Sequence, residues 1–107
     1  MNDMDRFTAL AEPHRRKILE LVARGPVASG AIAAEFDLTA AAVSQHLKAL
    51  RLAGLVQVEV DGPRRIYRLD PDGLAAVDAW LDQVRGFWSR RLDALEAALE
   101  QEKGDSR

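Results

Sequence analysis

The sequence predicts a mainly α-helical fold with one β-hairpin, in the order α-α-α-α-β-β-α. Residues 29–53 indicate two short helices joined by a turn, with polar side chains on the outer face of the second. The apolar period then changes from 3.6 to 2 over residues 56–69, which is typical of half-buried strands. From residue 70 the helical period returns and continues to about residue 101. Together these three observations predict a winged helix-turn-helix.

Two helices are expected before the helix-turn-helix. Residues 4–10 form a short helix with Phe7 and Leu10 on one side. Pro13 opens the second helix, over residues 14–23. Proline lacks an N–H, but the N–H at a first helical position has no partner within the helix, so nothing is lost.

The helix-turn-helix itself is expected over residues 29–36 and 40–53. Thr39 is a candidate N-cap, since its hydroxyl can accept a backbone N–H of the first turn. Gly54 supplies the left-handed residue that ends the second helix.

A hairpin follows directly. Valines at every second position from 56 to 60 indicate a half-buried strand. Asp61-Gly62 signals a turn, and Pro63 after it favours a loop longer than two residues. The returning strand covers residues 64–69, so the hairpin is a wing.

The last helix, over residues 70–101, carries an apolar stripe at intervals of three and four residues. Unbroken from Pro71 to Gln101, it would be roughly 46 Å long at ~1.5 Å per residue, against a radius of gyration of about 13 Å for such a domain. Part of the stripe then lacks cover within its own chain, which indicates a partner. Gly86 in its middle is a candidate kink. Residues 102–107 are expected to be a disordered tail.

Aromatic and aliphatic residues at helical spacing are more often core or interface than an effector pocket, so we expect this stripe to form an interface. The expected interface residues are Phe7, Leu10, Val77, Trp80, Leu81, Val84, Phe87, Trp88, Leu92, Leu95 and Leu99.

Composition narrows the class of protein. The 107 residues make one domain, with the helix-turn-helix and wing over residues 5–69. The chain has no cysteine, which excludes disulfides, thiol redox sensing and cysteine-ligated metal. His14 and His46 lie far apart in the sequence and form no recognisable ligand pair. No apolar run reaches the ~18 residues of a membrane span, and no secretory signal is visible, so we expect a cytoplasmic protein.

The charge is unevenly distributed, although the net charge is −2. Residues 1–69 hold ten basic against eight acidic residues, and residues 70–107 hold five against nine. Residues 39–69 alone carry a net charge of +3. Nucleic-acid binding depends on such a local basic footprint, so the charge permits DNA binding.

Several passages resemble the ArsR family of bacterial transcriptional regulators. They are ALAEPHRRKIL (9–19), LT (38–39) leading to AVSQHLKAL (42–50), AGLV (53–56) and DGPRRIYRL (61–69). The resemblance covers residues 5 to about 100. Phe87-Trp88 and the following LDALE are similar to a metal-independent branch. The resemblance to the family implies a homodimer that pairs through the first and last helices and represses transcription from palindromic operators.

The family's metal sensing does not carry over. The family's cysteine-containing motif reads VASGA here (27–31), and the last helix lacks the histidines of the alternative motif beyond Asp78. We expect no metal, no cofactor and no response to metals.

The expected partner is double-stranded DNA, because early residues of the second helix of a helix-turn-helix meet base edges. Glutamine can contact adenine in bidentate fashion, and arginines at a hairpin tip suit phosphates or the minor groove. Alanines at 40 and 41 replace residues that are usually polar in the family, which limits them to thymine methyl contacts. The candidate DNA-binding residues are Thr39, Ala40, Ala41, Ser44, Gln45, Lys48, Arg51, Arg64 and Arg65.

Simpler roles compete with some of these. His46 is expected to pack or hydrogen-bond near the helix junction, and Arg15 and Arg16 to form salt bridges with Glu12 or Glu20. No nucleophile–base pair or glycine-rich phosphate loop stands in convincing context, so no enzyme is expected. Two rival functions stay open: a protein-interaction module with little DNA binding, or a regulator that senses an organic ligand at the dimer seam.

Overall fold

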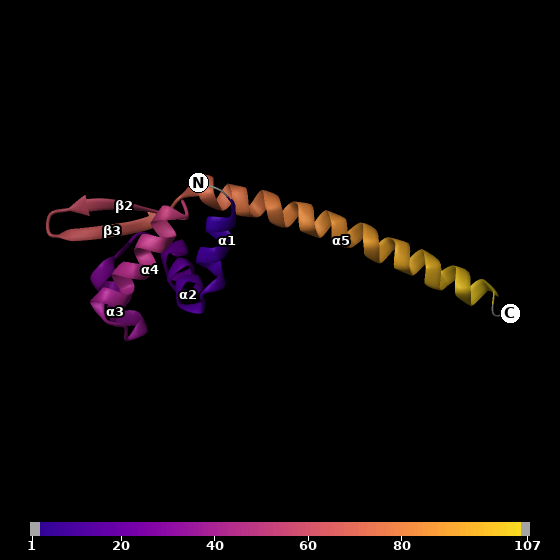
Figure 1. Ribbon diagram of the computed structural model, residues 1–107, viewed down its shortest axis with the longest axis horizontal. Helices are drawn as coiled ribbons and strands as arrows, with labels where there is room; N and C mark the ends of the chain where they lie inside the picture. The colour runs from indigo at the N-terminus through magenta and orange to yellow at the C-terminus, as the bar shows by residue number, and fades with distance from the viewer. Residues whose placement is uncertain (1–2, 106–107) are drawn as a thin grey trace. The chain divides into compact units, whose positions relative to one another are not determined.

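The computed structural model describes residues 3–105. The chain divides into two units, one up to Ala75 and the other from Ala76 onward, and each is described by itself. The elements follow one another as α1 (Asp3–Ala11), α2 (Pro13–Ala23), β1 (Val27–Ala28), α3 (Ser29–Phe36), α4 (Ala40–Leu52), β2 (Val56–Asp61), β3 (Arg64–Leu69) and α5 (Pro71–Asp105) (Figure 1). The predicted fold, a winged helix-turn-helix, is confirmed.

The core of the first unit is formed by apolar residues that recur at helical spacing on α2, α3 and α4. They meet the base of the hairpin and the end of α1. The buried residues are Ala9, Ile18, Val22, Ile32, Val43, Leu47, Leu50, Ala53, Leu55, Val56 and Tyr67. The buried faces of α3 and α4 hold these two helices together as the predicted helix-turn-helix.

Local signals at the helix ends behave as the sequence predicts. The hydroxyl of Thr39 accepts the backbone N–H of Ala42 at 3.1 Å and caps α4. Gly54 has a φ of +75°, the left-handed conformation expected after that helix. Asp37 ends α3 with a φ of 52°, which aspartate tolerates better than most residues.

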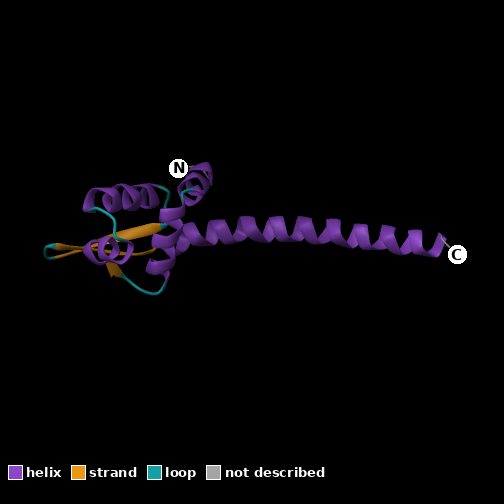
Figure 2. Ribbon diagram, turned by 90° about the horizontal axis from the view of Figure 1, so that it is seen from below, coloured by secondary structure: helices purple, strands orange, loops and turns teal. Residues whose placement is uncertain are grey.

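A third strand adds to the predicted hairpin. The sheet order is β1-β3-β2 and all pairs are antiparallel, so the returning strand of the wing lies in the middle. Figure 2 shows the strands in orange beside the helices of the first unit. Val27 pairs with Tyr67 and Ala28 with Ile66. A strand of two residues is too short to show an alternating pattern, which is why the sequence did not indicate it.

The hairpin corrects two predictions. Asp61 pairs directly with Arg64, so the loop has two residues and the expected longer loop is wrong. Gly62 takes a φ of +60° at the first central position, and Pro63, whose φ is fixed near −65°, fits the second position of a type II′ turn. The strand is also less buried than predicted. Val58 and Val60 are 37% and 71% exposed, because the hairpin extends past the helices that cover its base (Figure 1).

Helix α5 is continuous through Gly86, and it runs to Asp105, past the expected end at residue 101. Of the expected disordered tail, residues 102–105 are therefore helical, and residues 106–107 lie outside the described range. Within residues 3–105, no helix has the length and apolar character needed to cross a bilayer.

The first turn of α5 belongs to the first unit and packs backbone against backbone. Gly73 is buried, and a Cβ built on it would overlap the carbonyl oxygen of Gly54. Two glycines therefore meet here: Gly54, which follows α4, and Gly73, whose missing side chain allows the first turn of α5 to lie against it.

Candidate nucleic-acid interface

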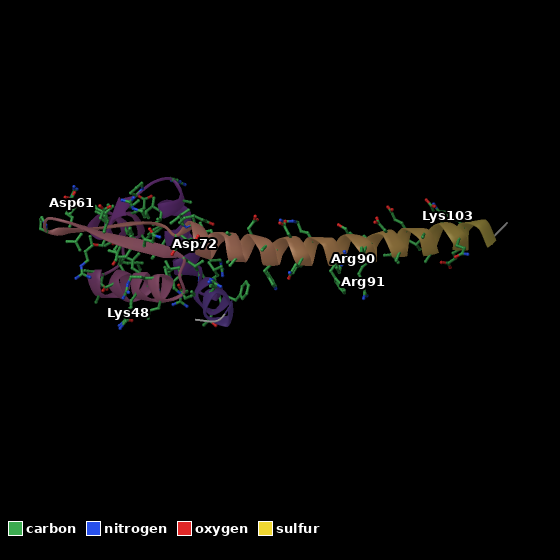
Figure 3. The ribbon with its side chains drawn as sticks, turned by 90° about the horizontal axis from the view of Figure 1, so that it is seen from above. Lys48, Asp61, Asp72, Arg90, Arg91 and Lys103 are labelled. Atoms are coloured by element: carbon green, nitrogen blue, oxygen red, sulfur yellow. The ribbon has the colours of Figure 1, made fainter. Side chains whose placement is uncertain are left out.

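Helix α4 separates a buried face from an exposed polar face. Val43, Leu47 and Leu50 are buried. The predicted DNA-contacting residues of this segment are all exposed: Thr39, Ala40, Ala41, Ser44, Gln45, Lys48 and Arg51. The Lys48 side chain points outward from the helix (Figure 3). An exposed helix face that begins with small residues and continues with polar and basic ones is compatible with entry into a major groove.

The wing meets the start of this helix at one cavity. Ala40 and Ser44 of α4 line it together with Arg65 of β3, and its volume is about 350 Å³. Ser29 and Gly30 of α3 also line this cavity. The structure therefore brings together predicted residues from two separate segments, the second helix of the helix-turn-helix and the wing.

The two wing arginines differ in their surroundings. Directly paired residues of antiparallel strands share a face. Arg65 pairs with Val60, and Arg64 pairs with Asp61, so consecutive arginines lie on opposite faces of the hairpin. The Nη2 atom of Arg64 lies 3.6 Å from Oδ2 of Asp61. Both groups of that ion pair are exposed, so it holds the arginine only weakly. Asp61 marks the tip of the hairpin in Figure 3.

The guanidinium groups of Arg15 and Arg16 donate hydrogen bonds to backbone carbonyls of α1. The sequence predicted ion pairs with acidic neighbours instead. The Nε of Arg15 donates to the carbonyl of Ala9 at 2.7 Å, and Nη1 of Arg16 donates to that of Leu10 at 2.8 Å. These carbonyls belong to the last turn of α1, where the helix leaves them without intrahelical donors. Both arginines therefore connect α1 to α2, and the expected salt bridges are wrong.

The two histidines lie far apart in the sequence, but they meet in space. Their rings stack with centroids 5.7 Å apart and an interplanar angle of 17°. The Nδ1 of His14 lies 3.0 Å from Oε1 of Glu12, and Nδ1 of His46 lies 3.7 Å from Oε2. The sequence does not indicate this cluster, because its residues come together only when α4 packs across the start of α2. His46 packs near a helix junction, as expected, and it lies inside a cluster of possible ligands.

The Glu12 carboxylate is also the N-cap of α2, since it accepts the backbone N–H of Arg15 at 2.9 Å. Burial favours its protonated form. Hydrogen bonds from the His14 ring and from the backbone N–H groups of Arg15 and His14, with the charge of His46, outweigh burial and lower the pKa of Glu12 to about 2. The group is therefore a carboxylate at any pH at which the protein is expected to function.

Helix α5 exposes the apolar residues that the sequence assigned to a dimer interface. The exposed ones are Trp80, Leu81, Val84, Phe87, Trp88, Leu92, Leu95 and Leu99, with exposed fractions from 38% to 60%. Val77, Phe7 and Leu10 are half-buried. The row from Leu81 to Leu99 exceeds the scattered apolar residues that ordinary surfaces show.

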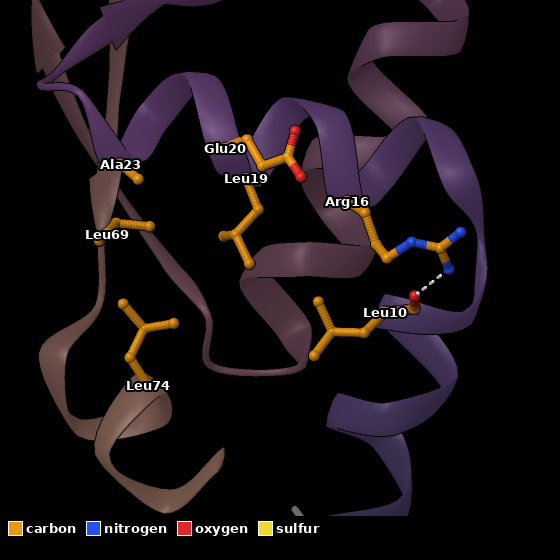
Figure 4. A pocket seen from close by; sticks show the side chains of 7 residues that line it. All are labelled: Leu10, Arg16, Leu19, Glu20, Ala23, Leu69 and Leu74. Atoms are coloured by element: carbon orange, nitrogen blue, oxygen red, sulfur yellow. Dashed lines mark hydrogen bonds between the residues drawn. The ribbon is translucent and has the colours of Figure 1, made fainter. Parts of the chain in front are cut away.

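An apolar pocket of about 370 Å³ lies in the first unit. Leu10, Leu19, Leu69 and Leu74 point toward one another across it, and Arg16 closes one side through its hydrogen bond to the Leu10 carbonyl (Figure 4). Its volume falls within the range of small-molecule sites.

Comparisons with known proteins agree with this geometry. Residues 10–59 match a family described as a helix-turn-helix domain. The chain is 44% identical over 100 residues to the HTH-type transcriptional regulator Rv2034 of Mycobacterium tuberculosis, covering 94% of this chain and 91% of that protein. It is 32% identical over 75 residues to the transcriptional repressor SdpR of Bacillus subtilis, covering 70% and 83%.

A solved structure is similar over most of the fold. It is a homodimeric winged helix-turn-helix DNA-binding domain from Mycobacterium bovis, described as a possible ArsR-family transcriptional regulator. It matches with a TM-score of 0.65 and 32% identity, over 78% of this chain and 77% of that one. The relatives, the fold and the helix-turn-helix match agree: this chain belongs to the ArsR family of winged helix-turn-helix transcriptional regulators.

Proposed function

We propose that the protein is a transcriptional repressor that binds a palindromic DNA operator as a homodimer. The observation that carries the proposal is the shared cavity of α4 and the wing, where Ala40, Ser44 and Arg65 come together. A recognition helix and an arginine-bearing ribbon that meet at one edge can contact base edges and the neighbouring backbone at once.

Each α4 residue has a distinct role in this proposal. Ser44 and Gln45 read bases in the major groove, and Gln45 is suited to a bidentate contact with adenine. Ala40 and Ala41 offer methyl groups that can contact thymine. Lys48 and Arg51 neutralise phosphates farther along the same helix. Of the two wing arginines, Arg65 makes the larger contribution, because it lines the cavity with Ser44.

Dimerisation doubles this surface. The apolar row of α5, with Phe7 and Leu10 of α1, is the proposed interface. Two recognition helices related by a two-fold axis read half-sites about 34 Å apart, and this spacing matches one turn of DNA. Repression then follows from occupancy of a promoter, which requires no catalysis. The repressor name of the Bacillus subtilis relative supports this direction of regulation.

The test is binding to the DNA upstream of the protein's own gene, measured by fluorescence anisotropy beside a random duplex of equal length. We expect the upstream duplex to bind at least about 1,000-fold more tightly, the low end of specific recognition. If neither duplex binds at 50 mM salt, or if both bind equally, the proposal is wrong. The first outcome would favour a protein-interaction module built on the same fold.

Two sets of substitutions distinguish sequence-specific base contacts from contacts with the phosphate backbone. Ser44→Ala with Gln45→Ala removes base contacts, so we expect the preference for the upstream duplex to fall while random-duplex affinity stays. Lys48→Ala removes a phosphate contact and should weaken both duplexes alike.

The leucine-lined pocket favours a second candidate, a regulator that senses a small apolar ligand. It lies beside Leu10 of the proposed interface, so an occupant could alter pairing. Thermal-shift screening with small apolar compounds tests this candidate. A hit that loses its effect in Leu19→Ala supports it, and a screen without hits of that kind rejects it.

A further inference from the structure

We propose that Glu12, His14 and His46 form a binding site for a divalent transition-metal ion of the zinc class. The site lies between the N-terminal turn of α2 and the middle of α4. It is separate from the family's cysteine site and does not depend on the proposed DNA binding.

The geometry is that of three converging ligands. Each residue offers one ligand atom, and these atoms all lie within 4.8 Å of one another. Nδ1 of His14 lies 3.0 Å from Oε1 of Glu12, and Nδ1 of His46 lies 3.7 Å from Oε2 of the same carboxylate. Ligands about 2.0–2.2 Å from a tetrahedral zinc ion lie roughly 3.3–3.5 Å from each other, so separations of up to 4.8 Å must shorten by as much as about 1.5 Å when an ion binds.

The donor set suits this class of ion. Imidazole nitrogens favour zinc, copper and nickel, whereas calcium and magnesium take oxygen ligands. Two histidines and one glutamate is a ligand set that zinc uses when one position stays open. His14 is the open side here, with about half of its side chain exposed, whereas the His46 side chain is 19% exposed.

The glutamate is already oriented for the role. The N–H of Arg15 holds Oε2 at 2.9 Å, and this outer contact fixes the carboxylate while Oε1 faces His14. The guanidinium groups of Arg15 and Arg16 are engaged with the carbonyls of α1, so they do not neutralise Glu12. On binding, the ion replaces the hydrogen bond between His14 Nδ1 and Glu12. The displaced proton moves to Nε2 or is released to solvent.

An ion bound at this site would link α4, the proposed recognition helix, to α2. His46 follows Gln45 directly in α4, while His14 belongs to α2, so an ion bound to both adds a cross-link between these helices. An ion that binds only the folded chain also raises its stability.

The chain makes the experiment simple, because it contains two histidines and no cysteine. Any imidazole ligation must use these residues, provided that the protein carries no histidine tag. Untagged, metal-depleted protein is titrated with Co²⁺ and followed by visible absorption, and Zn²⁺ is then added in competition. We expect saturation at one ion per chain and displacement by Zn²⁺.

Three variants and one control assign the ligands. Loss of an outer contact already weakens metal affinity by about 10–100-fold, so His14→Gln, His46→Gln and Glu12→Gln should each weaken Zn²⁺ binding by at least about 100-fold. Glu35→Gln removes an exposed carboxylate of α3 and should leave it unchanged. If binding survives the double histidine variant, is absent at millimolar Zn²⁺, or saturates at one ion per two chains, the proposal is wrong.

NMR of the wild-type protein covers the case in which a variant fails to fold. Zn²⁺ should shift the ring resonances of both histidines together. A shift of one ring alone, or of neither, overturns the site. The titration contains no DNA, so its failure and the failure of the proposed repressor function are distinct results.

Discussion

Gly73 provides a direct test of how the first turn of α5 packs within the first unit. Its backbone approaches the Gly54–Leu55 segment so closely that a Cβ would overlap the Gly54 carbonyl oxygen and lie 2.7 Å from the carbonyl carbon. Both atoms belong to the backbone and cannot rotate away. Gly73→Ala must therefore push α5 off the segment that ends α4.

The magnitude follows from two opposing effects. Alanine is favoured over glycine inside a helix by about 1 kcal/mol. Overpacking of a close contact costs about 1–3 kcal/mol, and here the overlap is with backbone, so we expect net destabilisation. Gly86 is the matched control in the same helix, because its added Cβ would meet only the flexible guanidinium of Arg90, at 3.5 Å. Gly86→Ala should keep the full propensity gain without the overlap, so the two variants should differ by the overpacking cost, about 1–3 kcal/mol.

The assay is urea unfolding followed by circular dichroism, with both variants and the wild type at one protein concentration. Equal concentration matters because the stability of a dimer depends on it. We expect the midpoint to fall for Gly73→Ala and to rise for Gly86→Ala. A Gly73→Ala midpoint at or above the wild-type value would refute the close packing described here.

Three further predictions concern the cap, the wing and the proposed interface. Thr39→Ala should lower the free energy of unfolding by about 1 kcal/mol through loss of the α4 cap, and Thr39→Ser should restore most of it; equal stability of all three proteins would contradict the cap. Arg65→Ala should reduce the slope of log K against log salt by about 1, and Arg64→Ala, on the other face of the hairpin, by less; the reverse order would disprove the assignment. Leu92→Glu with Leu95→Glu should convert the protein from dimer to monomer in sedimentation at micromolar concentration, and an unchanged mass would place the interface elsewhere.

Local features of this fold could be predicted from the sequence because their causes are local. Thr39 and Gly54 mark the two ends of α4 through a hydroxyl and a left-handed φ, and both are visible as residue types. The apolar period gave the buried faces of α2, α3 and α4 in the same way. These signals need no knowledge of what packs against them.

Features that depend on distant contacts could not be predicted. The two-residue strand β1 exists only because β3 offers it an edge. The exposure of Val60 depends on where the helices stop covering the hairpin. His14 and His46 look unrelated in sequence, and only the packing of α4 across the start of α2 brings both to Glu12. The guanidinium groups of Arg15 and Arg16 likewise donate hydrogen bonds to backbone carbonyls, and the pattern of charges in the sequence does not indicate these contacts.

The number of chains bound to one upstream duplex tests the proposed repressor most directly. Sedimentation of the complex gives that number, and footprinting gives the sites. Two chains per duplex, with protected half-sites about 10–10.5 base pairs apart, is the result that a two-fold pair of recognition helices predicts. A single chain bound as tightly as the wild-type complex, or protection without paired half-sites, would contradict it.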